Sequence, residues 1–216
     1  MKNGHFNNCT TPDDCWCEVK RYWFLFVLAL IIFAGEVVGG IISGSLALLA
    51  DAGHVLTDTI AMLVSIITAY YVKRKRWSEK SIRAIGGVIN ALLLLAIAIW
   101  ISVEGMERIN HPRDIISKTM MAFAIFGALG NWLQYKVLGT LKEEHVTHKA
   151  MRLHILSDLF QSATVVLGGV AIYFTQKNII DPVLSVGIAL WMAWRAWNLI
   201  IQIKEGHSHH HAHHRH

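Results

Sequence analysis

The chain has 216 residues, of which 54% are hydrophobic and only 16% are charged. Soluble domains are about 25% charged, so this composition excludes an ordinary soluble protein and predicts that most side chains face lipid or other helices. The formal net charge of +5 comes largely from Lys and Arg in short polar segments, which is typical of a membrane topology signal. We therefore expect membrane lipid as a partner and no nucleic acid.

Six apolar segments are each long enough to cross a bilayer as a helix, which takes about 20 residues. They cover approximately residues 22–42, 46–72, 82–107, 118–138, 149–174 and 182–203. Asp181 precedes Pro182 at the start of the last segment, a pair that predicts an N-cap and a first-turn proline. The expected fold class is an all-α membrane protein with six transmembrane helices.

The same pattern divides the chain into a polar tail at 1–20, a membrane domain at 21–204 and a His-rich tail at 205–216. Lys and Arg concentrate before the first segment, after the second and fourth segments, and after the last. Because cytoplasmic loops are enriched in these residues, we expect both termini in the cytoplasm. The first apolar segment is longer than a usual signal-peptide core, so we expect it to remain as a helix.

Two histidine–aspartate pairs lie inside the second and fifth apolar segments: His54 with Asp58, and His154 with Asp158. The i,i+4 spacing places both members of a pair on one helix face. A charged carboxylate in mid-membrane costs roughly 2.5–3.5 kcal/mol, so such a residue is by default functional. Two imidazoles and two carboxylates suit tetrahedral zinc. The two pairs together therefore predict a metal site between two helices.

Other polar residues lie in the apolar segments near these pairs. Asp51 is one helical turn from His54, where it would act as a relay, orient the imidazole, or form a structural hydrogen bond. Glu36 would line a proton path or join two helices. Asn90 and Asn131 are intramembrane amides, which more often join helices than contact ions. Ser162 lies on the same helix stripe as Asp158.

The most specific stretch is Ser45-Leu-Ala-Leu-Leu-Ala-Asp51-Ala-Gly-His54-Val-Leu-Thr-Asp58. This motif resembles the cation diffusion facilitator family of metal–proton antiporters, and the similarity extends over about residues 20–204. The resemblance implies a six-helix bundle with His54, Asp58, His154 and Asp158 as transport ligands between the second and fifth helices. It implies export of zinc from the cytoplasm in exchange for protons, through the plasma membrane, which in bacteria is the inner membrane. Cobalt and cadmium tolerate the same ligands.

Two departures from the family pattern affect these expectations. Family members commonly continue into a cytoplasmic ferredoxin-like domain that dimerises, and we expect this chain to belong to a subgroup without it. A homodimer would then depend on transmembrane faces, such as the stripe at 35–44 or the tryptophans Trp191, Trp194 and Trp197. The fifth helix also carries Gln161 where the family often has a small glycine, which puts local packing in doubt.

Both tails carry residues that bind metal in other contexts. The C-terminal histidines would collect metal loosely near the cytoplasmic side, the alternative being an expression tag; they are His207, His209, His210, His211, His213, His214 and His216. Three cysteines in the N-terminal tail would add soft ligands or remain ordinary reduced thiols; they are Cys9, Cys15 and Cys17.

Two other functions fit a membrane chain with metal ligands. An intramembrane metalloenzyme would need an open coordination position, but four protein ligands close the site and no His-Glu-x-x-His occurs, so we expect no enzyme and no catalytic residue. A passive divalent cation channel would favour weak binding by rings of carbonyls or carboxylates. Coupling to protons distinguishes a transporter from such a channel.

Overall fold

The computed structural model describes residues 12–73, 79–139 and 146–208, with side chains for 23–64, 85–137, 154–201, 203 and 204. Within these ranges the chain forms six helices. They are α1 (Pro12–Ser43), α2 (Leu46–Lys73), α3 (Glu79–Asn110), α4 (Ser117–Gly139), α5 (Val146–Thr175) and α6 (Ile180–Ser208). The six predicted segments are thus all helical, and the fold class is confirmed.

The helix ends differ from the predicted segments at the two chain termini. Helix α1 begins at Pro12 and α6 ends at Ser208, so parts of the expected tails at 1–20 and 205–216 are helical. The apolar pattern marks where a helix enters lipid, whereas Lys, Arg and Glu are good helix formers and let the helix continue beyond it. Apolar periodicity therefore underestimates these two helices.

Within the part of the chain whose side chains are described, five helices contain an apolar stretch suited by length and composition to a membrane span; the stretches are Trp23–Ser43, Leu46–Val64, Ile85–Asn110, His154–Thr175 and Ile180–Ile201. Helix α4 has sufficient length, but Asn131 and Gln134 lower its apolar content. Both side chains are buried in the bundle. Asn131 donates to the Ser162 hydroxyl of α5, and Gln134 donates to the Leu25 carbonyl of α1. Asn131 and Gln134 of α4 therefore face other helices.

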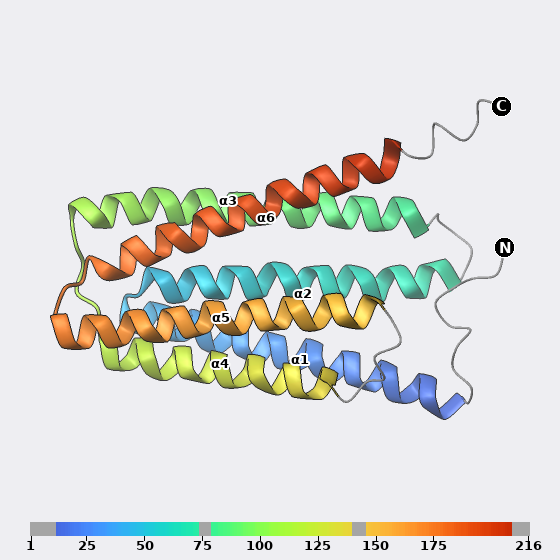
Figure 1. Ribbon diagram of the computed structural model, residues 1–216, viewed down its shortest axis with the longest axis horizontal. Coiled ribbons are helices and arrows are strands. Elements are labelled where there is room, and N and C mark those ends of the chain that lie inside the picture. The colour runs from blue at the N-terminus through green and yellow to red at the C-terminus, as the bar shows by residue number, and fades with distance from the viewer. Residues whose placement is uncertain (1–11, 74–78, 140–145, 209–216) are drawn as a thin grey trace.

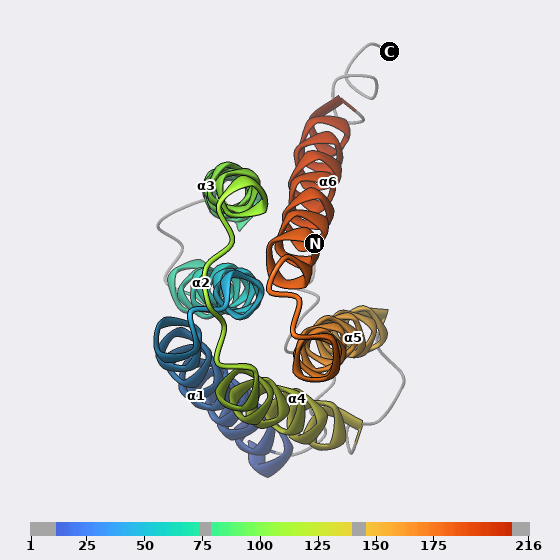
Figure 2. The same ribbon diagram turned by 90° about the vertical axis from the view of Figure 1, so that its left-hand side faces the viewer.

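Sequential helices run antiparallel along the long axis of the molecule (Figure 1). The connections α1–α2, α3–α4 and α5–α6 lie together at one end, here called the turn end. Helix α1 begins and α6 ends at the opposite end, here called the terminal end. Viewed end-on, α1, α2, α4 and α5 form one group, while α3 and α6 pair beside it (Figure 2). Helix α2 contacts α1, α3, α5 and α6, which gives it a central place.

The main hydrophobic core lies where α2 to α6 meet toward the turn end. Alanines in it, including Ala47, Ala98 and Ala189, are fully or almost fully buried, and such small side chains let helices approach closely. Gly35 and Gly39 of α1 pack against aromatic rings of α4, and Gly40 packs against Leu49 of α2. The glycine stripe at 35–44 is therefore used largely inside the chain.

The turn end is also joined by polar contacts. Gly44 has a positive φ of 74°, which suits glycine, and its carbonyl accepts a hydrogen bond from Arg108 at 2.6 Å. Asp181 accepts hydrogen bonds from the Ser45 hydroxyl and from the backbone N–H groups of Leu46 and Ala47. The prediction that Asp181 caps α6 is therefore wrong. Its carboxylate caps α2 instead, because the N-terminal N–H groups of α2 lie beside the first turn of α6.

Candidate functional site

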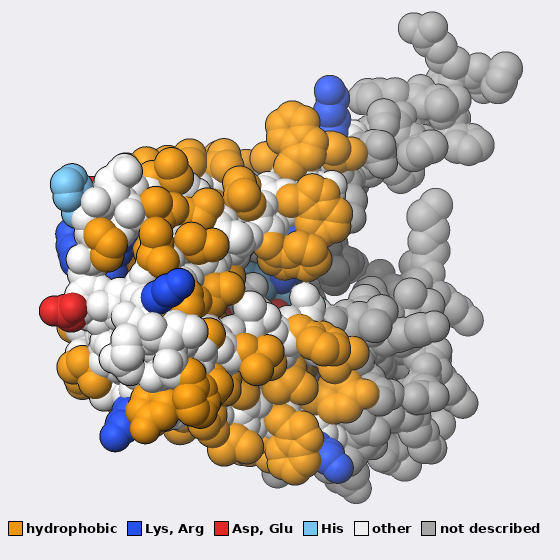
Figure 3. All heavy atoms as spheres, turned by 60° about the vertical axis from the view of Figure 1, so that its left-hand side comes forward, with side chains coloured by type: hydrophobic (Ala, Val, Ile, Leu, Met, Phe, Trp, Pro, Cys, Tyr) orange, Lys and Arg blue, Asp and Glu red, His pale blue; other side chains and the backbone are white. Residues whose placement is uncertain are grey.

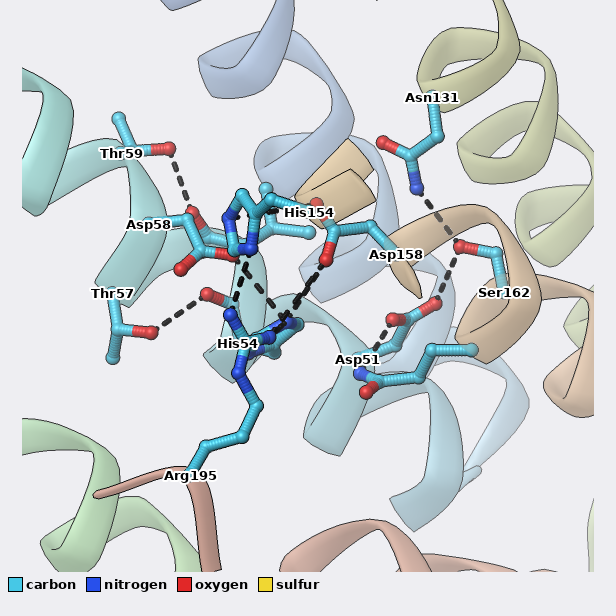
Figure 4. A network of polar contacts seen from close by, with 12 residues as sticks. Asp51, His54, Thr57, Asp58, Thr59, Asn131, His154, Asp158, Ser162 and Arg195 are labelled. Atoms are coloured by element: carbon cyan, nitrogen blue, oxygen red, sulfur yellow. Dashed lines mark hydrogen bonds and ion pairs between the residues drawn. The ribbon is translucent and has the colours of Figure 1, made fainter. Parts of the chain in front are cut away.

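The two predicted pairs meet between α2 and α5. His54 Nε2 lies 3.1 Å from Asp158 Oδ1 and 3.3 Å from Asp58 Oδ2. His154 Nε2 lies 3.0 Å from Asp58 Oδ2 and 3.8 Å from Asp158 Oδ2. Each imidazole thus contacts the carboxylate of its own helix and that of the facing helix. We call these four residues the His–Asp cluster (Figure 4).

The cluster lies within the bundle but is open on one side. The His54 side chain is only 1% exposed, whereas that of His154 is 25% exposed. Histidine, acidic and basic side chains are visible at the bottom of a hollow between apolar surfaces (Figure 3). One ligand atom each from His54, Asp58 and Asp158 lies within 4.8 Å of the others. The geometry therefore allows these three residues to contact one small cation, with His154 beside them.

Asp51 belongs to a separate network on the turn-end side of the cluster. Its carboxylate accepts hydrogen bonds from Gln161 at 2.9 Å and from Ser162 at 3.0 Å. Asn131 of α4 donates to Ser162 at 3.1 Å. Asp51, Asn131 and Ser162 therefore link α2, α4 and α5, as intramembrane polar groups commonly do.

This network revises two expectations. Of the three roles open to Asp51, the structure gives no support to orienting the His54 ring: its hydrogen bonds go to α5, and His54 Nδ1 is buried without a hydrogen-bond partner among the described residues. The bonds to α5 fit the structural hydrogen bond. Gln161 was expected to disturb packing, yet it donates to Asp51 from the wall of a groove of about 450 Å³ between α5 and α6. The larger side chain thus adds a helix contact.

Two predicted polar residues lie apart from the cluster. Glu36 of α1 is fully buried against Gly127 of α4, and neither carboxylate oxygen has a hydrogen-bond partner among the described residues. Asn90 of α3 is buried and its Oδ1 also has no partner there. Neither residue contacts a cluster side chain by a described hydrogen bond. Only their position within the membrane spans supports the predicted roles of Glu36 and Asn90 in a proton path or in joining helices.

Sequence reasoning missed Arg195, which extends from α6 into the cluster (Figure 4). Its Nη1 lies 2.6 Å from His54 Nε2 and its Nη2 lies 2.7 Å from His154 Nδ1. Its Nη1 is also 4.0 Å from Asp158 Oδ1. The missed signal was an arginine within an apolar span, which is rare and usually has a functional partner.

Several predicted metal-binding residues of the tails cannot be placed. Cys9 and the histidines from His209 onward lie outside the described residues. The side chains of Cys15, Cys17 and His207 lie outside them as well. The accessory metal sites in the two tails therefore stay predictions.

Comparison with known proteins supports the same assignment as the motif. The chain is 35% identical over 195 residues to the zinc transporter ZitB of Escherichia coli, covering 88% of this chain and 62% of that protein. It is 33% identical over 170 residues to the metal cation efflux system protein CzcD of Cupriavidus metallidurans, covering 76% of this chain and 54% of that protein. A cadmium, cobalt and zinc/H(+)-K(+) antiporter of Bacillus velezensis is 29% identical over 174 residues, covering 77% and 55%.

The chain thus spans about three-fifths or less of the length of these relatives. The profile of the cation efflux transmembrane domain matches residues 22–203, which includes all of the His–Asp cluster, Asp51 and Arg195. Because this match covers most of the sequence and the greater part of each of the six helices, the chain belongs to the cation efflux family.

Proposed function

We propose that this protein exports divalent metal from the cytoplasm and that the His–Asp cluster binds the metal during transport. The observation that carries this proposal is the set of four nitrogen–oxygen separations of 3.0–3.8 Å. Ligands about 2.0–2.2 Å from a tetrahedral zinc ion are about 3.3–3.6 Å from each other. Small side-chain shifts would therefore bring all four ligands around one ion.

The donor types favour zinc as the main substrate. Imidazole nitrogen and carboxylate oxygen are ordinary zinc ligands, and zinc tolerates the four-coordinate arrangement that two His–Asp pairs supply. Cobalt and cadmium accept the same donors, so selection among them depends on geometry and availability. The names of the relatives include zinc, cadmium and cobalt, which supports this substrate class.

We infer that protons are the counter-ion. A metal ion needs deprotonated ligands, so metal binding releases protons and protonation releases metal. Each cluster imidazole lies within hydrogen-bonding distance of a carboxylate, where a proton and a metal ion would compete for the same groups. One site can then exchange the two ions as access alternates between the two sides of the membrane.

The proposed orientation places the terminal end in the cytoplasm. Lys and Arg next to the spans favour the cytoplasmic side of a membrane, and they concentrate in the segments at the terminal end. The hydrophobic core and the Asp181 contacts lie toward the turn end, while His154 and Arg195 are partly exposed. This combination suits a state in which the cluster opens toward the cytoplasm and the turn end is closed.

We also propose a homodimer that forms through α6. The glycine stripe packs mainly within the chain, whereas Trp191, Trp194 and Trp197 are exposed on α6. Tryptophan is enriched both at protein interfaces and at membrane interfaces. Cross-linking in a bilayer through a cysteine at Trp194 would give a dimer if α6 is the interface, and only monomer if these rings face lipid.

The transport proposal is tested with the full chain in sealed liposomes that contain a zinc dye and a pH dye. Zinc flux should depend on an opposing proton gradient and should drive proton movement when zinc alone is supplied. Asp58→Asn should abolish both fluxes. Zinc flux that does not depend on the proton gradient would instead indicate a passive channel.

A further inference from the structure

Arg195 places a permanent positive charge among the residues assigned to the metal. The guanidinium contacts both histidines, with Nη1 2.6 Å from His54 Nε2 and Nη2 2.7 Å from His154 Nδ1, and the Arg195 side chain is 24% exposed. Arginine has only donor groups and keeps its charge in proteins. Where Arg195 donates to them, both histidine nitrogens that face it accept and carry no proton. His54 Nε2 then cannot also donate to Asp158 at 3.1 Å, and the shorter contact is the one with Arg195.

At His54 this contact uses the lone pair that the metal needs. His54 Nε2 is the nitrogen nearest to the two cluster carboxylates, and it is also the nitrogen that accepts from Arg195. An imidazole nitrogen has one lone pair. The guanidinium and a metal ion therefore cannot bind His54 Nε2 at the same time.

At His154 the contact acts through the opposite ring nitrogen. Arg195 donates to Nδ1, so the proton of a neutral His154 must be on Nε2, where it faces Asp58 at 3.0 Å. Nε2 then has no lone pair for metal, because a neutral imidazole is a donor at one nitrogen and an acceptor at the other. Arg195 thus holds His154 in the tautomer that cannot bind metal through Nε2.

We propose that Arg195 is a built-in cation that occupies the transport site in place of metal and must leave both histidines before metal can bind. This inference rests on the proposed metal transport by the His–Asp cluster. The guanidinium also partly balances the buried charges of Asp58 and Asp158, which would be costly to leave unpaired. Because Arg195 is on α6 and the ligands are on α2 and α5, metal loading frees α6 from the cluster.

The first test is zinc affinity of the purified full chain in lipid nanodiscs, measured by competition with a zinc-chelating dye. Arg195→Gln should tighten zinc binding at least about tenfold, which corresponds to about 1.4 kcal/mol, since it removes two charge-assisted hydrogen bonds to the ligands. Arg195→Lys should have a smaller effect in the same direction, because lysine keeps the charge but lacks the planar fork. Lys204→Gln is the matched control, since it removes an exposed charge from the same helix.

The second test reads the His154 tautomer by nitrogen NMR of the chain with labelled histidine, assigned by loss of the signal in His154→Gln. Metal-free wild type should show the Nε2–H form, and zinc should convert it to the Nδ1–H form. The metal-free Nε2–H form is the part of this result that depends on Arg195, because zinc bound at Nε2 gives the Nδ1–H form whatever Arg195 does. This measurement also decides the proposal if Arg195→Gln fails to fold, since a metal-free Nδ1–H form in the wild type would overturn it.

The outcomes separate this inference from the proposed function. If Asp58→Asn loses zinc binding but Arg195→Gln binds as the wild type does or more weakly, Arg195 does not compete with metal and the inference is wrong. If Asp58→Asn binds zinc as tightly as the wild type, the cluster is not the transport site and the proposed function fails first.

Discussion

The Asp181 carboxylate of α6 lies on the first turn of α2, with its Oδ2 2.8 Å from the Leu46 N–H nitrogen. Asp181 Oδ1 also accepts from the Ser45 hydroxyl at 2.5 Å and from the Ala47 N–H group at 3.2 Å. The N-terminus of a helix attracts negative charge, and its first N–H groups lack partners within the helix. One residue far along the chain thus caps α2 and joins α6 to the turn end.

We predict that Asp181→Asn destabilises the protein by about 2 kcal/mol, because hydrogen bonds to a charged acceptor contribute about 1.5–3 kcal/mol. The asparagine would turn one NH₂ group toward backbone donors. Unfolding of the purified protein in mixed detergent micelles measures the effect. Asp114→Asn is the control, since Asp114 is exposed at the same end and accepts only from Asn178 among its described hydrogen bonds. Equal stability of the two variants would show that the cap contributes little.

We predict that alanine at His54, Asp58, His154 or Asp158 lowers zinc flux to the background of empty liposomes, since each change removes one of the four proposed metal ligands. Membrane insertion should be retained. Thr164→Ala is the control on α5, because Thr164 is exposed and bonds only its own helix among the described contacts. Undiminished flux from Asp58→Ala would remove the cluster as the transport site.

Asp51→Asn should leave zinc affinity within about threefold of the wild type and slow turnover by about 10–100-fold, because it weakens the hydrogen bonds between α2 and α5 beside the cluster and outer groups of a metal site affect activity to this extent. Asp51 contacts Gln161 and Ser162 and is not hydrogen-bonded to His54. Dye competition gives the affinity and liposome flux gives the turnover. Complete loss of zinc binding would instead make Asp51 a metal ligand.

His54→Asp should shift selection toward cadmium, because a carboxylate is less directional than imidazole and can bind a larger ion through both oxygens. It also removes one of the two acceptors for Arg195. A competition flux assay with zinc and cadmium measures the ratio. An unchanged ratio would mean that helix packing rather than ligand type sets selectivity.

The sequence by itself determined the six helices and the proposed ligands. Apolar runs of about 20 residues have one stable form in a bilayer, the helix, because backbone groups must pair within the segment. The i,i+4 spacing then places His54 with Asp58, and His154 with Asp158, on single helix faces. These are local properties, and the structure brings the two pairs within 3.0–3.8 Å.

Only the tertiary structure decided the partners of Asp181, Gln161 and Arg195. Asp181 was expected to cap its own helix, Gln161 to disturb packing, and Arg195 was not singled out. In the structure they contact α2 at Leu46, Asp51 and His54 respectively. Each contact joins residues more than 100 positions apart, and helix periodicity carries no information on which helix lies opposite a given face. That choice depends on how all six helices pack together.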